Sequence, residues 1–253
     1  MAFLISACDG SSGAGSLDSG PTGTIHGRVR LAGDPPKPAT DAITQDQSTC
    51  GASVSLPRIV LGKDNGVADT FLILEGVPAA GRPGPAPSKQ ALLVDQKECQ
   101  YVPHTMIVPL GSNLEITNSD TILHNVNGKQ NGEARFNYAQ AVKGQRQSVD
   151  MAMVKPGILS LSCEAGHPWM SAHIYVAGDP YVALTNGDGE FVIKDVPPGT
   201  YTLKMWHEGV TVKQIHKRLQ LYEYEAPYEA SQQVTVTENG EVTVDFELEL
   251  RKE

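Results

Sequence analysis

The sequence predicts an all-β protein assembled from β-sandwiches. Its 253 residues include 25 Gly and 17 Pro, spread among Val- and Thr-rich runs, a composition typical of short strands joined by turns. Apolar and polar residues alternate in many short segments, and no apolar stripe with the 3.6-residue helical period persists for several turns. A chain of this length buries a substantial core and allows one to three small domains.

The first 22 residues are expected to be a lipid-bearing tether. MAFLISACDG places a short apolar run before Cys8, and its Leu/Ile-small-small-Cys pattern resembles a bacterial lipobox. Signal cleavage would leave lipidated Cys8 as the new N-terminus, followed by a Gly/Ser-rich linker over residues 9–22. The run is too short to span a bilayer and lacks a preceding basic stretch, so we expect the natural start to lie upstream or the chain to have been shortened. The alternative is a disordered tail with a chance cysteine.

Three stretches of strands follow the tether. Residues 23–95 form an N-terminal β region that includes GTIHGRVRLAG and RIVLGKDNGVADTFLILEG, with an exposed connection at 81–90 (GRPGPAPSKQ). Residues 96–178 contain further strands and end in SAHIYVAG. Residues 179–253 show NGDG and PPG turns between alternating segments, and Asn239-Gly240 turns a last hairpin.

The segment CEAGHPWM, residues 163–170, contains the clearest chemical motif. Cys163, His167 and Met170 offer a thiolate, an imidazole and a thioether within one short loop. A trigonal His₂Cys set with a weak axial Met is typical of a blue-copper site, whereas zinc favours a fourth firm ligand over a thioether. The alternative is that three core residues happen to be close in sequence.

A second imidazole lies upstream in NLEITNSDTILHNV, where His124 follows a strand and a polar turn. Its neighbour Asn125 is expected to tie the two ligand-bearing segments together and to damp motion of the thiolate. KPGILSLSC alternates apolar and polar residues and delivers Cys163 at the end of a strand, which is a rigid place for a ligand. We therefore expect one mononuclear copper ion, held by His124, Cys163, His167 and Met170.

These segments resemble a known family. Residues 101–126, including the N-x-D-x-x-x-H-N run, resemble the first half of a plastocyanin/amicyanin-type cupredoxin, and KPGILSLSCEAGHPWMSAHIYV resembles its second half. The resemblance implies an eight-stranded Greek-key sandwich, a type 1 copper and one-electron transfer. Three residues separate Cys163 from His167, where amicyanin has two, and Gly166 is expected to absorb the extra residue.

The same resemblance implies a docking surface. In such folds the outer edge of the second histidine reaches the surface, so we expect redox partners to dock weakly on an apolar rim of Pro168 and Trp169 around His167.

Residues 180–208 resemble a second family, the carboxypeptidase-regulatory-like, prealbumin-type sandwich. The shared pattern is T-x-x-D-G-x-F-x-I-x-D-V-P-P-G-T-Y-x-L, with turns at Asp188-Gly189 and Pro197-Pro198-Gly199. Residues 24–33 weakly resemble the start of a similar module. Such modules are mostly structural, and no catalytic set is visible here. The predicted fold is therefore all-β, with a Greek-key cupredoxin sandwich flanked by such segments.

The remaining cysteines, histidines and acidic residues offer further candidates. Cys50 and Cys99 are expected to form a disulfide in an oxidising compartment; free thiols or a second soft metal site with His104 are the alternatives. His104 and His207 are expected to be structural, although His104 is also a candidate metal ligand or proton-linked tuner. His173 is expected to be a core or surface residue. The acidic stretch 222–231 is expected to be a solvated loop, or else a docking site for a basic partner.

The function that these patterns predict is that of a blue copper protein, a one-electron carrier lipid-anchored to a bacterial membrane at its periplasmic or extracellular face. Expected partners are redox proteins such as cytochromes or dehydrogenases. The net charge of −9 argues against nucleic acid, and membrane contact is expected through the lipid only. The alternatives are copper handling, although Met- or His-rich tracts are absent, and an adhesion scaffold with incidental copper. We expect no enzyme, because the H-x-H pairs of copper oxidases are also absent.

Overall fold

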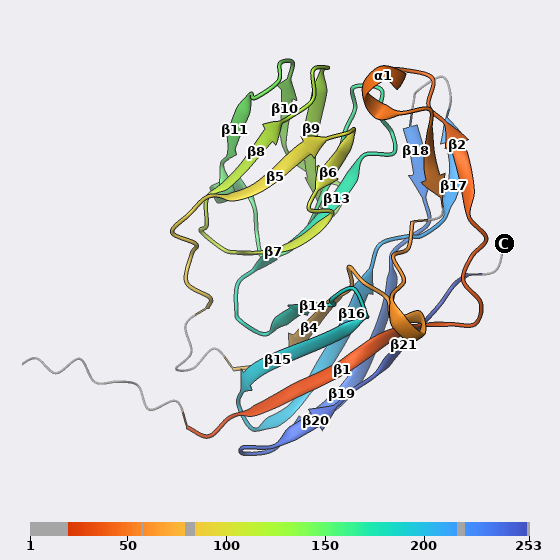
Figure 1. The fold of residues 1–253 in the computed structure, drawn as a ribbon. Coiled ribbons are helices and arrows are strands. Elements are labelled where there is room, and N and C mark those ends of the chain that lie inside the picture. Colours follow the sequence, from red (N-terminus) through yellow and green to blue (C-terminus); the bar gives the residue numbers. More distant parts are fainter. Residues whose placement is uncertain (1–19, 57, 79–83, 217–220, 252–253) are drawn as a thin grey trace, which may run out of the picture.

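In a computed structural model the chain forms two stacked β-sandwiches with a smaller group of strands beside them (Figure 1). The structure describes residues 20–251 except 57, 79–83 and 217–220. Among these residues the α-helix is limited to α1 (Gln47–Cys50), beside two short 3-10 turns, η1 (Lys63–Asn65) and η2 (Met151–Met153). The all-β prediction is confirmed. No helix in the described part is long and apolar enough to cross a bilayer, and Cys8 lies outside it.

The central sandwich contains the predicted copper motif. One sheet has the strand order β10-β9-β12-β13-β7 and the other β11-β8-β5-β6. β13 pairs in parallel with β7, and β5 pairs in parallel with β8, whereas the other neighbours are antiparallel. The strands are β5 (Leu92–Lys97), β6 (Gln100–Val102), β7 (Thr105–Pro109), β8 (Leu114–Asn118), β9 (His124–Gln130), β10 (Glu133–Gln140), β11 (Arg146–Val149), β12 (Gly157–Ser162) and β13 (Ser171–Ala177).

The second sandwich combines strands from both ends of the chain. One sheet has the order β15-β1-β20, with β21 also paired to β1, and the other has the order β14-β4-β16-β19. Strands that begin in the stretch 23–95 are therefore divided between the two sandwiches. β1 and β4 lie in this sandwich, and β5 lies in the central one. The strands are β1 (Gly23–Ala32), β4 (Phe71–Glu75), β14 (Val182–Leu184), β15 (Glu190–Val196), β16 (Gly199–His207), β19 (Tyr228–Val236), β20 (Glu241–Thr243) and β21 (Phe246–Glu249).

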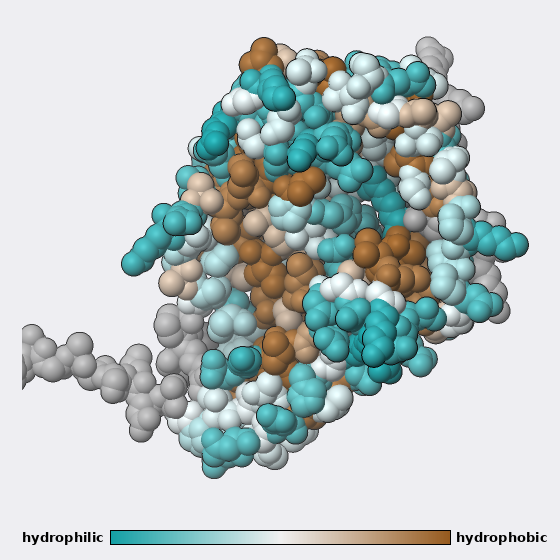
Figure 2. Space-filling model, in the orientation of Figure 1, coloured by the Kyte–Doolittle hydropathy of each residue, from teal (hydrophilic) through white to brown (hydrophobic). Residues whose placement is uncertain are grey.

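The alternation in the sequence explains which faces are buried. In β15 the residues Phe191, Ile193 and Val196 point into the core, while their neighbours face outward. The two sandwiches meet through aromatic rings: Phe71 lies 5.9 Å from Tyr175 of β13 and 5.8 Å from Trp206, between ring centroids. Figure 2 shows apolar residues gathered near this junction.

A third group of strands lies beside the central sandwich. β2 (Ala39–Ala42) pairs with β3 (Ser53–Leu56), and β17 (Val212–His216) pairs with β18 (Leu221–Tyr224). The predicted disulfide is confirmed: Cys50 at the end of α1 is bonded to Cys99 in the turn between β5 and β6. The covering segment, residues 39–56, is therefore attached to the central sandwich.

The expectation of a solvated loop at residues 222–231 is wrong. This stretch supplies most of β18 and the first four residues of β19, and Tyr222, Glu225 and Tyr228 are buried. The physical reason is that the acidic residues alternate with tyrosines, whose rings are large enough to pack inward. The Tyr222 hydroxyl donates to Asp41 of β2, which joins the two small sheets.

Glu225 gives a testable consequence for stability. Its Oε1 accepts from the amides of Val210 and Thr211, at 3.0 and 2.9 Å, and from the Tyr228 hydroxyl at 2.7 Å, while Arg251 contacts Oε2 at 3.3 Å. Burial alone would raise the pKa of Glu225, but these donors hold it below its usual value. The contribution of Glu225 to stability is therefore present above the pKa of an unfolded Glu, about 4.3, and is lost as pH falls through the lower folded pKa.

We expect Glu225→Gln to lower the free energy of unfolding at pH 7 by about 2 kcal/mol, because the hydrogen bonds lose their charge. Urea denaturation at pH 7 and at successively lower pH measures this effect, and the gap between variant and wild type should narrow under acid. Glu238→Gln, at an exposed position, is the control. A gap that does not change with pH would contradict the role of the carboxylate.

Candidate metal centre

Three of the predicted ligands converge inside the central sandwich. His124 is the first residue of β9, Cys163 directly follows β12, and His167 lies in the loop that leads to β13. Their ligand atoms lie within 4.8 Å of one another. The two Nδ1 atoms are 3.2 Å apart, and the Cys163 Sγ is 3.7 Å from the His167 Nδ1. Both imidazoles are 0% exposed and the thiol is buried, so the cluster is shielded from water.

The outer nitrogens of both rings bind carboxylates. The His124 Nε2 is 2.8 Å from Asp120 Oδ2, and the His167 Nε2 is 3.1 Å from Asp46 Oδ2. An ionised carboxylate only accepts hydrogen bonds, so each neutral ring must hold its hydrogen on Nε2. Each Nδ1 then presents a lone pair, and two lone pairs 3.2 Å apart repel unless a cation or a proton lies between them. A proton or a cation between the two rings would remove this repulsion.

The local electrostatics favour the neutral forms of the Cys163 thiol and the His167 ring. Burial raises the pKa of the Cys163 thiol, although neighbouring backbone amides oppose the shift. Burial lowers the pKa of His167, and the nearby His124 lowers it further. Burial alone would raise the pKa of Asp120, but the Cys99 amide and the His124 ring hold it below its usual value. A metal ion that binds here must therefore displace the thiol proton.

The loop that holds the ligands is closed by its own backbone. The Met170 amide donates to the His167 carbonyl at 3.0 Å, and the Cys163 amide donates to the Met170 carbonyl at 3.3 Å. Gly166 has φ +91°, a backbone conformation that residues with a side chain rarely adopt, so this loop position favours glycine. The Met170 side chain is 1% exposed and packs in the core beside this loop.

Asn125 links the two ligand-bearing segments. Its Oδ1 accepts from the amide of Glu164 at 3.0 Å, directly after Cys163. Its own carbonyl accepts from the buried Tyr101 hydroxyl at 2.6 Å. These contacts fix the end of β12 against the start of β9.

The expected exposure of the His167 ring edge is wrong for this chain. His167 is fully buried, and its Nε2 faces Asp46 in the covering segment rather than solvent. Trp169 is also buried, and its Nε1 donates to the Cys99 carbonyl at 3.1 Å. The reason is the covering segment itself, which lies over the loop and is bonded through Cys50 to the turn between β5 and β6. In the described part of the chain Pro168 is partly buried and Trp169 is buried, so the expected exposed rim does not form around His167.

Two acidic residues at the centre were missed from sequence. Asp120 had a signal, because it lies in the N-x-D-x-x-x-H run four residues before His124. Asp46 had none, since it is 121 residues from His167 and no local pattern connects them.

One family model matches part of the chain. The sequence model of the carboxypeptidase regulatory-like domain matches residues 161–249, less than half of the chain, and the match begins inside β12. A search of curated proteins found no match.

Among solved structures, an amicyanin from Paracoccus versutus is 20% identical, with a TM-score of 0.30, covering 42% of this chain and 96% of that one. A purple cupredoxin from Nitrosopumilus maritimus is 23% identical (TM-score 0.26; 40% and 87% covered). A copper-containing nitrite reductase from Thermus scotoductus is 22% identical (TM-score 0.30), and this chain spans only 26% of its length. Likenesses of this strength support no inference about function.

Proposed function

We propose that the protein is a type 1 copper protein that carries single electrons between redox proteins outside the cytoplasm. The observation that supports this most is the convergence of two imidazole lone pairs on a buried thiol, with both outer nitrogens bound to carboxylates. Bound copper would supply the one-electron chemistry by alternating between Cu(I) and Cu(II). His124, His167 and Cys163 would hold it, and Met170 is proposed as the weak axial donor.

The donor set fits such an ion. Bonds of about 2.0 Å to nitrogen and about 2.3 Å to sulfur, as for zinc, imply separations between ligand atoms close to those found. The measured values are 3.2 Å between nitrogens and 3.7 Å from nitrogen to sulfur. A thiolate with two imidazoles suits copper in both oxidation states.

The chain's own residues would keep the site rigid and dry. Strand residues hold His124 and Cys163, and the carboxylates of Asp120 and Asp46 set the orientation of both rings. The covering segment excludes water from His167. Little rearrangement of protein groups is then needed when the charge of the site changes, which favours fast electron transfer.

The proposal also includes the compartment in which the protein acts and the class of its partners. The Cys50–Cys99 disulfide favours an oxidising compartment, and the lipid anchor at Cys8 remains a proposal outside the described residues. We propose a carrier rather than an enzyme, with cytochromes or dehydrogenases as partners. Because His167 is covered, a partner would approach over the covering segment and not contact the ring directly.

That covering is the one observation that favours a second candidate, copper handling without electron transfer. A fully buried His167 offers no exposed ring edge for a rapid, transient redox encounter. Stopped-flow oxidation of the Cu(I) protein by a soluble cytochrome separates the two. Rapid transfer supports a carrier, and slow transfer through an intact blue site supports copper handling.

The proposed site itself is tested by adding one equivalent of Cu(II) to the purified protein. We expect a strong thiolate-to-copper absorption band and a narrow copper hyperfine splitting by EPR. A pale protein with ordinary tetragonal EPR parameters would contradict the type 1 assignment.

Met170→Leu is expected to keep copper and to raise the reduction potential, because removing a weak donor destabilises Cu(II) more than Cu(I). Voltammetry of the loaded protein measures the change. Met151→Leu, at another buried methionine of the same core, is the matched control and should keep the wild-type potential. An unchanged potential in Met170→Leu would show that Met170 is not the axial donor.

A further inference from the structure

A second cluster of metal-ligand side chains lies where the two sandwiches meet. His104 precedes β7 and His173 lies in β13, both in the central sandwich, while Glu208 follows β16 of the second sandwich. Their ligand atoms lie within 4.8 Å of one another. The His173 Nε2 is 3.0 Å from Glu208 Oε2, and the His104 Nε2 contacts Glu208 Oε1. The function proposed above uses none of them.

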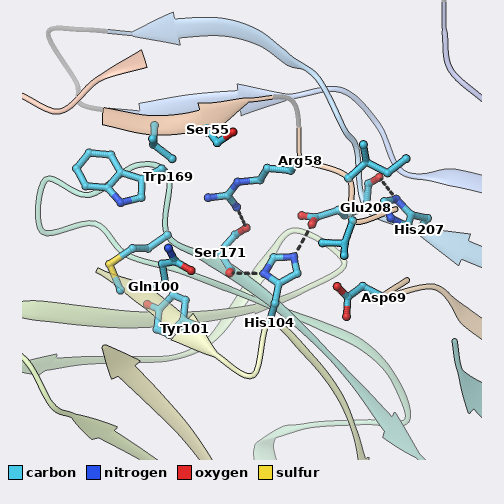
Figure 3. A pocket seen from close by; sticks show the side chains of 14 residues that line it. Ser55, Arg58, Asp69, Gln100, Tyr101, His104, Trp169, Ser171, His207 and Glu208 are labelled. Atoms are coloured by element: carbon cyan, nitrogen blue, oxygen red, sulfur yellow. Dashed lines mark hydrogen bonds and ion pairs between the residues drawn. The ribbon is translucent and has the colours of Figure 1, made fainter. Parts of the chain in front are cut away.

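The cluster borders a cavity of about 370 Å³ (Figure 3). His104 and Glu208 line this cavity, and the side chains of His104, His173 and Glu208 are 30%, 12% and 12% exposed. Figure 3 shows Arg58 and Asp69 around the same space. A ligand or water could therefore reach an ion at the cluster from the cavity side.

The outer nitrogens of both rings are anchored, as at the first site. The His104 Nδ1 donates to the Ser171 carbonyl at 3.0 Å, and the His173 Nδ1 lies 3.1 Å from the Ser160 hydroxyl. A carbonyl only accepts, so a neutral His104 presents the lone pair of its Nε2 to the Glu208 carboxylate. A lone pair facing a carboxylate is stable only with a proton or a metal ion between them.

The backbone around Glu208 is also fixed. The carbonyl of Glu208 accepts from the His207 Nδ1 at 2.8 Å, and the His207 ring is buried. A Cβ at Gly209 would lie 1.9 Å from the Glu225 carbonyl oxygen, so the chain passes too closely there for any other residue. Glu208 is thus held toward the two histidines by groups outside the cluster.

We propose that His104, His173 and Glu208 form a second metal site, for a divalent first-row ion such as Zn²⁺, which would join the two sandwiches. Two imidazoles and one carboxylate are a common zinc ligand set and leave a coordination position open, here toward the cavity. The set contains no sulfur, so it suits a harder ion than the thiolate site does. Around the cavity the two carboxylates of Glu208 and Asp69 carry more negative charge than the single guanidinium of Arg58 balances, which favours binding of a cation.

The competing possibility is a proton-bridged ion pair. Burial alone would raise the pKa of Glu208, but its hydrogen bonds to His104 and His173 hold it well below the usual value. Burial alone would lower the pKa of His104, yet the Glu208 contact raises it. A metal ion at this cluster must displace the bridging protons, so binding should release protons, and a pure ion pair would bind no metal.

Isothermal titration with Zn²⁺ in two buffers of different ionisation enthalpy tests the proposal. Cys163→Ala removes the thiolate of the first site, and we expect this full-length variant to bind one Zn²⁺ with release of protons. Adding Glu208→Gln or His104→Gln should weaken binding by about 100-fold or more, because one protein ligand is lost. His26→Gln, at a histidine in β1 outside both clusters, should bind as strongly as its parent.

A structural readout keeps the test valid if a variant folds poorly. X-ray absorption of Zn²⁺ bound to Cys163→Ala with His124→Gln, which leaves only one imidazole at the first site, should show two imidazoles, with the remaining ligands oxygen and no sulfur. An ion shell without two imidazoles, no Zn²⁺ binding, or unchanged binding after both substitutions would overturn the proposal. These outcomes do not depend on copper, so they leave the carrier function to its own test.

Discussion

Cys163→Ala is expected to abolish the intense thiolate-to-copper absorption of the loaded protein while the sandwich stays folded. The thiolate is the only group in the proposed ligand set that gives such a band, and the other two described cysteines are bonded to each other. Cys163 is 5% exposed and removing one sulfur leaves a small cavity, so the loss of stability should be about 1 to 2 kcal/mol.

Absorption spectra and circular dichroism of wild type and variant measure both effects. His26→Gln removes an imidazole far from the loop in sequence and should leave the band unchanged. If the band persisted in Cys163→Ala, then Cys163 would not be a ligand and the copper proposal would fail. If the band disappeared together with the β-sheet signal, Cys163→Ser would provide the same test with a smaller change in volume.

The strands could be predicted because the chain alternates where one face of a sheet is buried. EFVIKDV reads as β15 without knowledge of any partner, and KPGILSLSC delivers its cysteine directly after β12. The pairing of strands was not predictable in this way. β1 lies between β15 and β20, which are both more than 150 residues further along the chain. The alternation of β1 does not indicate which strands it pairs with.

The two sites show the same contrast between residues that local sequence identifies and contacts that only the folded chain creates. Cys163 and His167 share one short loop, and the N-x-D-x-x-x-H run singles out His124, so local sequence was enough to propose them. Asp46 faces His167 only because residues 39–56 fold back over the loop. Glu208 meets His104 and His173 only because the two sandwiches pack together. Contacts of this kind depend on tertiary packing, and single residue types gave no sign of them.

Removing the disulfide by Cys50→Ala with Cys99→Ala is expected to lower the free energy of unfolding by about 4 kcal/mol, because the bond closes a loop of about 50 residues in the unfolded chain. The two cysteines are separated by 49 positions. Urea denaturation measures the loss. Cys163→Ala is the matched control, since it also removes a buried cysteine, but no cross-link.

Removing the disulfide should also loosen the segment around Asp46 more than the rest of the protein. A cross-link far from that segment would not have this effect. The amides of Thr49 and Cys50 donate to the Asp46 carbonyl, so their hydrogen exchange reports on the segment that presents Asp46 to His167. In the double variant these amides should exchange faster, relative to global unfolding, than in wild type. Unchanged protection, or a loss of stability no larger than that of Cys163→Ala, would mean that packing alone holds the cover. Faster exchange would instead show that the covalent bond holds the segment that presents Asp46 to His167, and that reducing the bond loosens the cover over the site.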